Sequence, residues 1–130
     1  MIEVYTDGAS RGNPGPSGVG IYIKYGKIQK EELQYIGEYT NHEAEFIAVI
    51  KALEYCREHF STEIISCRSD AKVVVDAIDK NYVKNKSYQI YLDRINSLTN
   101  IFPYFFIKWI PEKQNKRADI LARKALMNQN

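Results

Sequence analysis

The order of hydrophobic periods along the chain constrains its fold more than any other feature of the sequence. Apolar and other side chains alternate in residues 2–7, 19–25 and 32–39, which is the period of β-strands. A glycine-rich turn at residues 8–18 separates the first two runs, and a turn around Gly26 precedes the third. Strands joined by turns pair in opposite directions, so the first third of the chain predicts three antiparallel strands.

The rest of the chain alternates between helical and strand periods. Residues 40–43 match the capping-box pattern of a helix start, and apolar residues then recur at steps of three and four. Further elements are expected in this part of the chain, strands at 63–69 and 104–110 and helices at 70–78, around 88–98 and from about residue 115. Because strands that follow helical crossovers lie parallel to their neighbours, we predict an α/β fold, with helices packed on a mixed sheet.

Length and composition favour one soluble domain. The 130 residues, 45% of them apolar, are enough for one hydrophobic core, and we expect a single domain over residues 1–130. No apolar run approaches the ~20 residues that span a bilayer, and the start of the chain lacks the layout of a signal peptide. We therefore expect a cytoplasmic protein that makes no membrane contact.

Cysteine content and net charge say little about function. Cys56 and Cys67 lie in apolar stretches with no second pair and no histidine at ligand spacing, so we interpret them as reduced core residues rather than zinc ligands. The net charge of +2 is nearly balanced, and nucleic-acid binding depends on local clusters of charge. The candidate function must come from other residues.

Several carboxylates lie where the expected elements meet. Asp7 ends the first strand, where a turn residue is the structural alternative, and Asp70 follows the fourth, where it could cap a helix. Asp119 lies beside the apolar face of the last helix, where a surface acid near a helix start is ordinary. Glu43 is explained by the capping box. Glu45 lies at or beside the buried side of its helix, so we expect a positive group opposite it.

Taken together, four of these acids (Asp7, Glu45, Asp70 and Asp119) predict a metal site. A central strand, the following parallel strand and two flanking helices can bring their side chains to one place. Carboxylates within ~4 Å of one another repel, so protons or hard cations must balance them, and oxygen-only ligands favour Mg²⁺ or Mn²⁺. In nucleases, pairs of such metals activate the attacking water and stabilise the leaving oxygen of a phosphoryl displacement.

Four segments resemble ribonuclease H type 1 enzymes, in the order of that family. Residues 5–15, Tyr-Thr-Asp-Gly-Ala-Ser-Arg-Gly-Asn-Pro-Gly, are similar to the family's opening strand and turn, and this motif is long and specific. Residues 40–45 resemble the start of its first helix, residues 69–71 its second-strand aspartate site, and residues 115–122 its final helix. The resemblance covers nearly the whole chain.

The resemblance implies both a fold and an activity. The fold is a five-stranded mixed sheet, three antiparallel strands followed by two parallel ones, flanked by helices. The activity is endonucleolytic hydrolysis of the RNA strand of RNA/DNA hybrids, which leaves 5′-phosphate and 3′-hydroxyl ends. Double-stranded RNA is a further possible substrate, and we expect the protein to act as a monomer.

The resemblance also implies roles for individual residues. The four acids correspond to the family's ligands for two Mg²⁺ ions, which Mn²⁺ could replace. Asn13 and Asn41 would contact the 2′-hydroxyls of the RNA through the minor groove, the group by which a protein tells RNA from DNA. Thr40 would lie near a phosphate of the DNA strand.

Two features depart from the family pattern. Many members carry a histidine in a mobile loop before the last helix, whereas residues 109–115 here form a short loop without one. Glu112 is a candidate replacement, although a solvated loop acid is the simpler explanation of this residue. The basic extension by which some members grip the hybrid is reduced to residues 80–86, a possible phosphate contact or simply a solvated loop.

Two other functions are compatible with parts of the pattern. The first is a catalytically weak or inactive nucleic-acid-binding module of the same fold, suggested by the missing histidine. Retention of all four acids argues against it, because without catalysis nothing offsets their repulsion. The second is a phosphotransferase of the actin and sugar-kinase type, which would need a second lobe for which this chain has no room.

Overall fold

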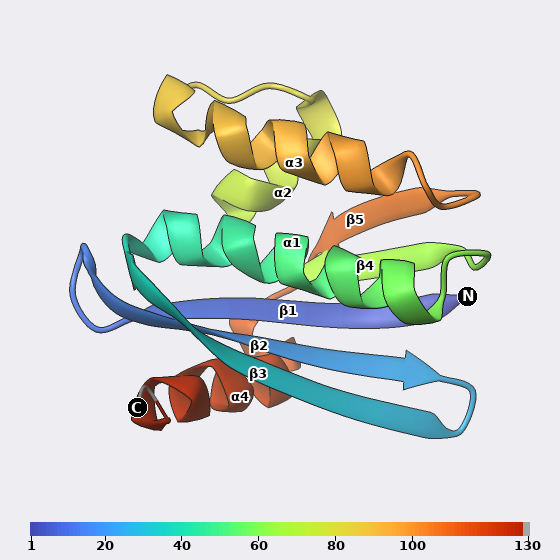
Figure 1. The fold of residues 1–130 in the computed structure, drawn as a ribbon, viewed down its shortest axis with the longest axis horizontal. Coiled ribbons are helices and arrows are strands. Elements are labelled where there is room, and N and C mark those ends of the chain that lie inside the picture. Colours follow the sequence, from blue (N-terminus) through green and yellow to red (C-terminus); the bar gives the residue numbers. More distant parts are fainter. Residues whose placement is uncertain (129–130) are drawn as a thin grey trace.

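The computed structural model describes residues 1–128 and confirms the predicted α/β fold. Its sheet has five strands in the order β3-β2-β1-β4-β5, in which β1 pairs antiparallel with β2 and parallel with β4 (Figure 1). The strands are β1 (Ile2–Ser10), β2 (Gly15–Tyr25), β3 (Ile28–Tyr39), β4 (Ile65–Ser69) and β5 (Phe105–Trp109). The helices are α1 (Asn41–His59), α2 (Lys72–Lys80), α3 (Gln89–Thr99) and α4 (Lys116–Met127), with short 3₁₀ turns η1 (Lys86–Tyr88) and η2 (Glu112–Gln114).

The first two strands are longer than the alternating pattern predicts. β1 and β2 remain paired as far as Ser10 and Ser17, so the connecting turn shortens to residues 11–14. β3 likewise begins at Ile28 rather than residue 32, close to Gly26, whose φ of 60° suits the tight turn. The strands extend because backbone hydrogen bonds to a neighbour hold residues that carry no hydrophobic period.

The prediction that Asp70 begins the second helix is wrong. Helix α2 begins at Lys72, and its N-cap is Ala71, which makes no side-chain capping bond. Asp70 therefore lies in a bend between β4 and α2, and its carboxylate is free of a capping role.

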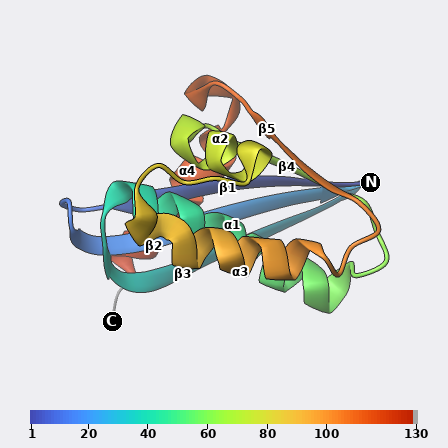
Figure 2. The same ribbon diagram turned by 90° about the horizontal axis from the view of Figure 1, so that it is seen from above.

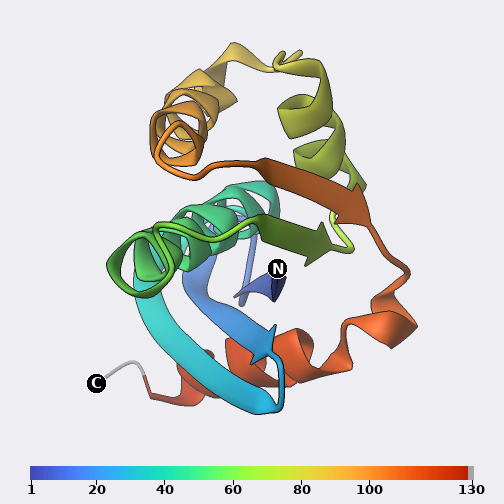
Figure 3. The same cartoon turned by 90° about the vertical axis from the view of Figure 1, so that its right-hand side faces the viewer.

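Helices cover both faces of the sheet. α1 lies on one face with α3 packed outside it, whereas α4 lies on the other (Figures 2 and 3). Two glycines permit this close packing. A Cβ atom at Gly20 would lie 2.2 Å from the Ala118 carbonyl oxygen of α4, and one at Gly8 would lie 2.4 Å from the Ala44 backbone of α1. The end of β1 is therefore packed closely against α1, and the paired part of β2 is packed closely against α4.

The main hydrophobic core lies between the sheet and helices α1, α2 and α3. It includes Cys56 and Cys67, which are free and fully buried, as predicted. Burial raises the pKa of each thiol to about 12, so both remain protonated and unreactive at neutral pH. Within residues 1–128, every helix is too short or too polar to span a membrane.

Candidate active site

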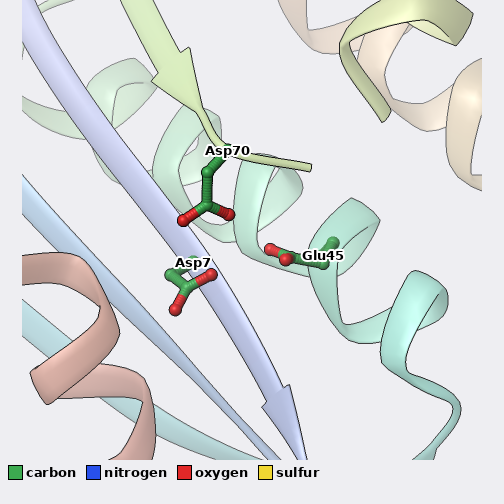
Figure 4. A group of neighbouring side chains, drawn as sticks. All are labelled: Asp7, Glu45 and Asp70. Carbon is green, nitrogen blue, oxygen red and sulfur yellow. The ribbon is translucent and has the colours of Figure 1, made fainter. Parts of the chain in front are cut away.

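Three of the four predicted acids meet at one end of the sheet. Asp7 projects from β1, Glu45 from α1 and Asp70 from the bend after β4, and their side chains point toward one another (Figure 4). One carboxylate oxygen from each lies within 4.8 Å of the other two. The parallel register of β1 and β4, which pairs Thr6 with Ser69, brings the two aspartates together at the next position.

Asp7 is buried within a strand rather than exposed in a turn. Only 6% of the residue is exposed, and β1 continues for three residues beyond it. The turn explanation for this aspartate is therefore wrong. Burial, followed by the charges of Glu45 and Asp70, raises the pKa of Asp7 well above its usual range.

Glu45 is held by a backbone amide and not by a basic side chain. The Gly8 N–H donates to Glu45 Oε1 at 2.8 Å, a contact that the close approach of α1 to β1 allows. Within residues 1–128 no lysine or arginine forms an ion pair with Glu45, so no basic side chain supplies the positive group expected opposite it. Burial raises the pKa of Glu45, and the Gly8 N–H offsets only part of this shift.

Asp70 is oriented by Asn115, a residue whose role the sequence pattern did not indicate. Asn115 is 1% exposed and donates through Nδ2 to the Thr6 carbonyl at 2.8 Å and to Asp70 Oδ2 at 3.4 Å. The sequence marked it only as the start of the last helix. The one feature of the sequence that could have indicated this role is the position of Asn115, a polar residue directly before the alanine-rich apolar face of the last helix. Burial also raises the pKa of Asp70, and Asn115 opposes this shift.

Asp119 lies at the rim of the cluster. It stands in the first turn of α4 and lines the same cavity of about 650 Å³ as the other three acids, but it is outside the group within 4.8 Å. Arg123 Nε donates to Asp119 Oδ1 at 3.0 Å from the next turn of the helix. The structure therefore places the fourth predicted acid beside the site with its charge partly compensated by an arginine.

Of the three predicted substrate-contact residues, only Asn41 lines this cavity. Asn13 Oδ1 accepts from the Asn41 N–H at 3.0 Å, and Asn41 lines the cavity. Thr40 forms the predicted capping box, in which its hydroxyl accepts from the Glu43 N–H at 3.2 Å. Glu112 of η2 also lines the cavity.

The arrangement suits hard divalent cations. Its donors are carboxylate oxygens, and their burial and proximity penalise the ionised forms unless positive charge is bound. Sites with only oxygen ligands select Mg²⁺, Mn²⁺ or Ca²⁺ over softer metals. The residues present therefore fit the predicted class of metal.

Comparisons with known proteins agree along the whole chain. A model of the RNase H family matches residues 1–127. The EbsB protein of Enterococcus faecalis is 42% identical over 127 residues, which span 97% of this chain and 94% of that protein. RNase H1 from the archaeon Halobacterium salinarum superposes with a TM-score of 0.90 at 35% identity, covering 98% of each chain. LC11-RNase H1, solved in complex with an RNA/DNA hybrid, gives a TM-score of 0.90 at 32% identity, covering 98% of each chain.

Proposed function

The chain belongs to the ribonuclease H family, and we propose that it is an endonuclease that hydrolyses the RNA strand of RNA/DNA hybrids. The observation that carries the proposal is the cluster of Asp7, Glu45 and Asp70 at the end of β1. The complex of the similar LC11-RNase H1 with an RNA/DNA hybrid supports this substrate class. The proposal treats residues 1–130 as one catalytic domain that acts as a monomer.

The four acids are proposed to hold two Mg²⁺ ions, or Mn²⁺ in their place. When bound, such ions activate water and stabilise the leaving oxygen, a reaction that yields 5′-phosphate and 3′-hydroxyl ends. The protein's own contribution is orientation, since Gly8 holds Glu45 and Asn115 holds Asp70. Asp119 would contribute from α4, because its carboxylate interacts with the side chain of Asp7 while Arg123 contacts its Oδ1.

Substrate selection is proposed to come from the loop and helix start beside the acids. Asn13 and Asn41 are exposed, and the backbone N–H of Asn41 donates to Asn13 Oδ1. This contact keeps the two residues side by side, where their side-chain amides would face adjacent 2′-hydroxyls of the RNA strand. The Thr40 hydroxyl accepts from Glu43 and keeps its own proton to donate to a phosphate of the DNA strand. Double-stranded RNA also presents 2′-hydroxyls and is a second substrate to test.

Glu112 is proposed as the loop acid that replaces the family's histidine. It lines the cavity from η2, and its charge contributes to the raised pKa of Asp70. Neither His42 nor His59 lines this cavity.

The test is incubation of the purified protein with labelled RNA/DNA hybrid and Mg²⁺ or Mn²⁺. We expect cleavage by the wild type and its loss in Asp7→Asn, by at least about a hundredfold, because that variant removes a metal-binding charge. Asp79→Asn, an exposed acid of α2, is the matched control and should cleave normally. Unchanged cleavage by Asp7→Asn would contradict the assignment of the site. No cleavage of any hybrid by the wild type would favour the binding module.

A further inference from the structure

Asp70 is the member of the acid cluster that lies outside any helix or strand. Asp7 is held within β1 and Glu45 within α1, whereas Asp70 follows the last residue of β4 and precedes the N-cap of α2. Its position depends on individual hydrogen bonds, because neither a β-ladder nor a helix fixes its backbone. The orientation of its carboxylate toward the other two acids therefore needs a specific explanation.

Trp109 supplies a hydrogen bond at the Asp70 backbone itself. It is the last residue of β5, directly opposite Ser69 in the parallel register, and its indole N–H donates to the Asp70 carbonyl at 3.1 Å. On the other side of Asp70, the Ser69 hydroxyl accepts from the Ala71 N–H at 3.0 Å. Two hydrogen bonds thus stabilise the backbone of the bend, while Asn115 contacts the Asp70 carboxylate.

Core packing does not account for the tryptophan at this position. Trp109 is 49% exposed, although tryptophan is a large apolar side chain that proteins mostly bury. Ile107, two residues earlier in β5, is only 5% exposed. The indole N–H of Trp109 makes a defined polar contact, a hydrogen bond to the Asp70 carbonyl.

We propose that Trp109 is a positioning residue that holds the Asp70 backbone so that its carboxylate faces Asp7 and Glu45. Its hydrogen bond thereby raises the affinity of the site for divalent cations. Partners behind a metal ligand commonly change metal affinity by about 10–100-fold, even though they do not touch the metal. The inference deepens the proposed function, since it concerns how the same site binds its cations, but its test does not require catalysis.

The test compares Mn²⁺ binding by the wild type and by Trp109→Phe, with free Mn²⁺ followed by electron paramagnetic resonance. Phenylalanine keeps an aromatic ring in β5 but has no N–H, so we expect about tenfold weaker binding. Tyr104→Phe is the matched control, because it removes a polar group from an exposed aromatic residue before the other end of β5. Its Mn²⁺ affinity should equal that of the wild type.

A second measurement uses the wild type alone. Trp109 is the only tryptophan in the 130 residues, so tryptophan emission reports on this contact. We expect the emission of the wild type to change as Mg²⁺ is added, with a defined midpoint Mg²⁺ concentration. The Asp70→Asn variant should show no such change. Emission that ignores bound Mg²⁺, or a folded Trp109→Phe variant with wild-type Mn²⁺ affinity, would overturn the inference. Weakened Mn²⁺ binding in that variant, together with a wild type that cleaves no hybrid, would support the inference and reject the proposed function.

Discussion

At the scale of single residues, the acid cluster destabilises the folded protein when no divalent cation is bound. Burial, and then the charges of Glu45 and Asp70, raise the pKa of Asp7 from its ordinary 3.8 to about 10. A carboxyl group whose pKa is raised by folding stabilises the folded state below its ordinary pKa. This contribution is lost as the pH rises through the raised value. Without divalent cations, the protein should therefore lose stability between about pH 4 and pH 10.

Replacing Asp7 by asparagine should remove the part of this pH dependence that comes from Asp7. In a chelator at pH 7, we expect Asp7→Asn to be more stable than the wild type by roughly 1–2 kcal/mol, because Asp7 must take up a proton to be buried beside two other acids whereas asparagine is neutral already. The difference should shrink as the pH falls below about 4, where the wild-type carboxyl becomes protonated in the unfolded state as well as in the folded state. Thermal unfolding followed by circular dichroism at several pH values measures it, with Asp79→Asn as the control. A variant that is less stable than the wild type at pH 8 would contradict the expectation.

Asn115 should matter for stability as well as for the site. Asn115→Ala removes a buried bond to the Thr6 carbonyl and leaves that acceptor unpaired, which costs about 1–3 kcal/mol. It also releases Asp70, so hybrid cleavage should require a higher Mg²⁺ concentration. Urea unfolding and Mg²⁺ titration of cleavage measure the two effects. If unfolding shifts while the Mg²⁺ dependence stays unchanged, Asn115 serves the fold alone.

At the scale of elements, α1 joins the glycine-rich turn to the acid cluster. Its first turn carries the capping box of Thr40 and the bond from Asn41 to Asn13, and Glu45 follows within the next turn. The same helix start is thus proposed to hold both the substrate contacts and one metal ligand. Disturbing the cap should affect helix stability and substrate binding together.

The Thr40→Ala variant tests the Thr40 hydroxyl both as a helix cap and as a substrate contact. It removes the hydroxyl that accepts from the Glu43 N–H and should destabilise the protein by about 0.5–2 kcal/mol. It should also raise KM for the hybrid and leave kcat nearly unchanged, because the proposed contact is to a phosphate distant from the reaction. Thr40→Ser keeps the hydroxyl and is the control. Equal KM values for Thr40→Ala and Thr40→Ser would mean that the Thr40 hydroxyl does not contact the substrate.

At the scale of the whole molecule, the mixed sheet is what concentrates the charge. The parallel pairing of β1 with β4 and the packing of α1 on β1 gather acids from three distant segments of the chain. Bound cations would offset their repulsion in the folded state only, since the unfolded chain holds these acids apart. Cation binding should therefore be linked to folding.

Mg²⁺ should accordingly raise Tm. At a concentration 100 times its Kd, the stabilisation should reach about 2.7 kcal/mol. Calorimetric scans with MgCl₂, and with NaCl at equal ionic strength, distinguish site binding from screening of surface charge. Asp7→Asn should show a much smaller rise. An equal rise in both proteins, or the same effect from NaCl, would place the stabilisation elsewhere on the surface.

Local pattern was enough to predict the class of fold and the residues of the acid cluster. A period of two predicted the strands and steps of three and four predicted the helices, because each element buries one side of its own backbone. The capping box of Thr40 and Glu43 was predicted correctly for a similar reason, since its bonds link residues three apart. Four acids, Asp7, Glu45, Asp70 and Asp119, were predicted as a group from the order of the elements and from the family resemblance. The structure brings the carboxylates of the first three within 4.8 Å of one another.

The tertiary structure decided the features that depend on distant segments meeting. The pairing of Ser10 with Ser17 extended both strands. Asp70 is contacted by Asn115, which lies 45 positions away in the sequence, and by Trp109, which lies 39 positions away. The rim position of Asp119 also follows from how α4 packs on the sheet. Sequence by itself determined periodicity, capping and the kinds of acid present, because these depend on neighbouring residues. Their geometry required the fold, because hydrogen bonds and charges act through space between segments whose register no local pattern records.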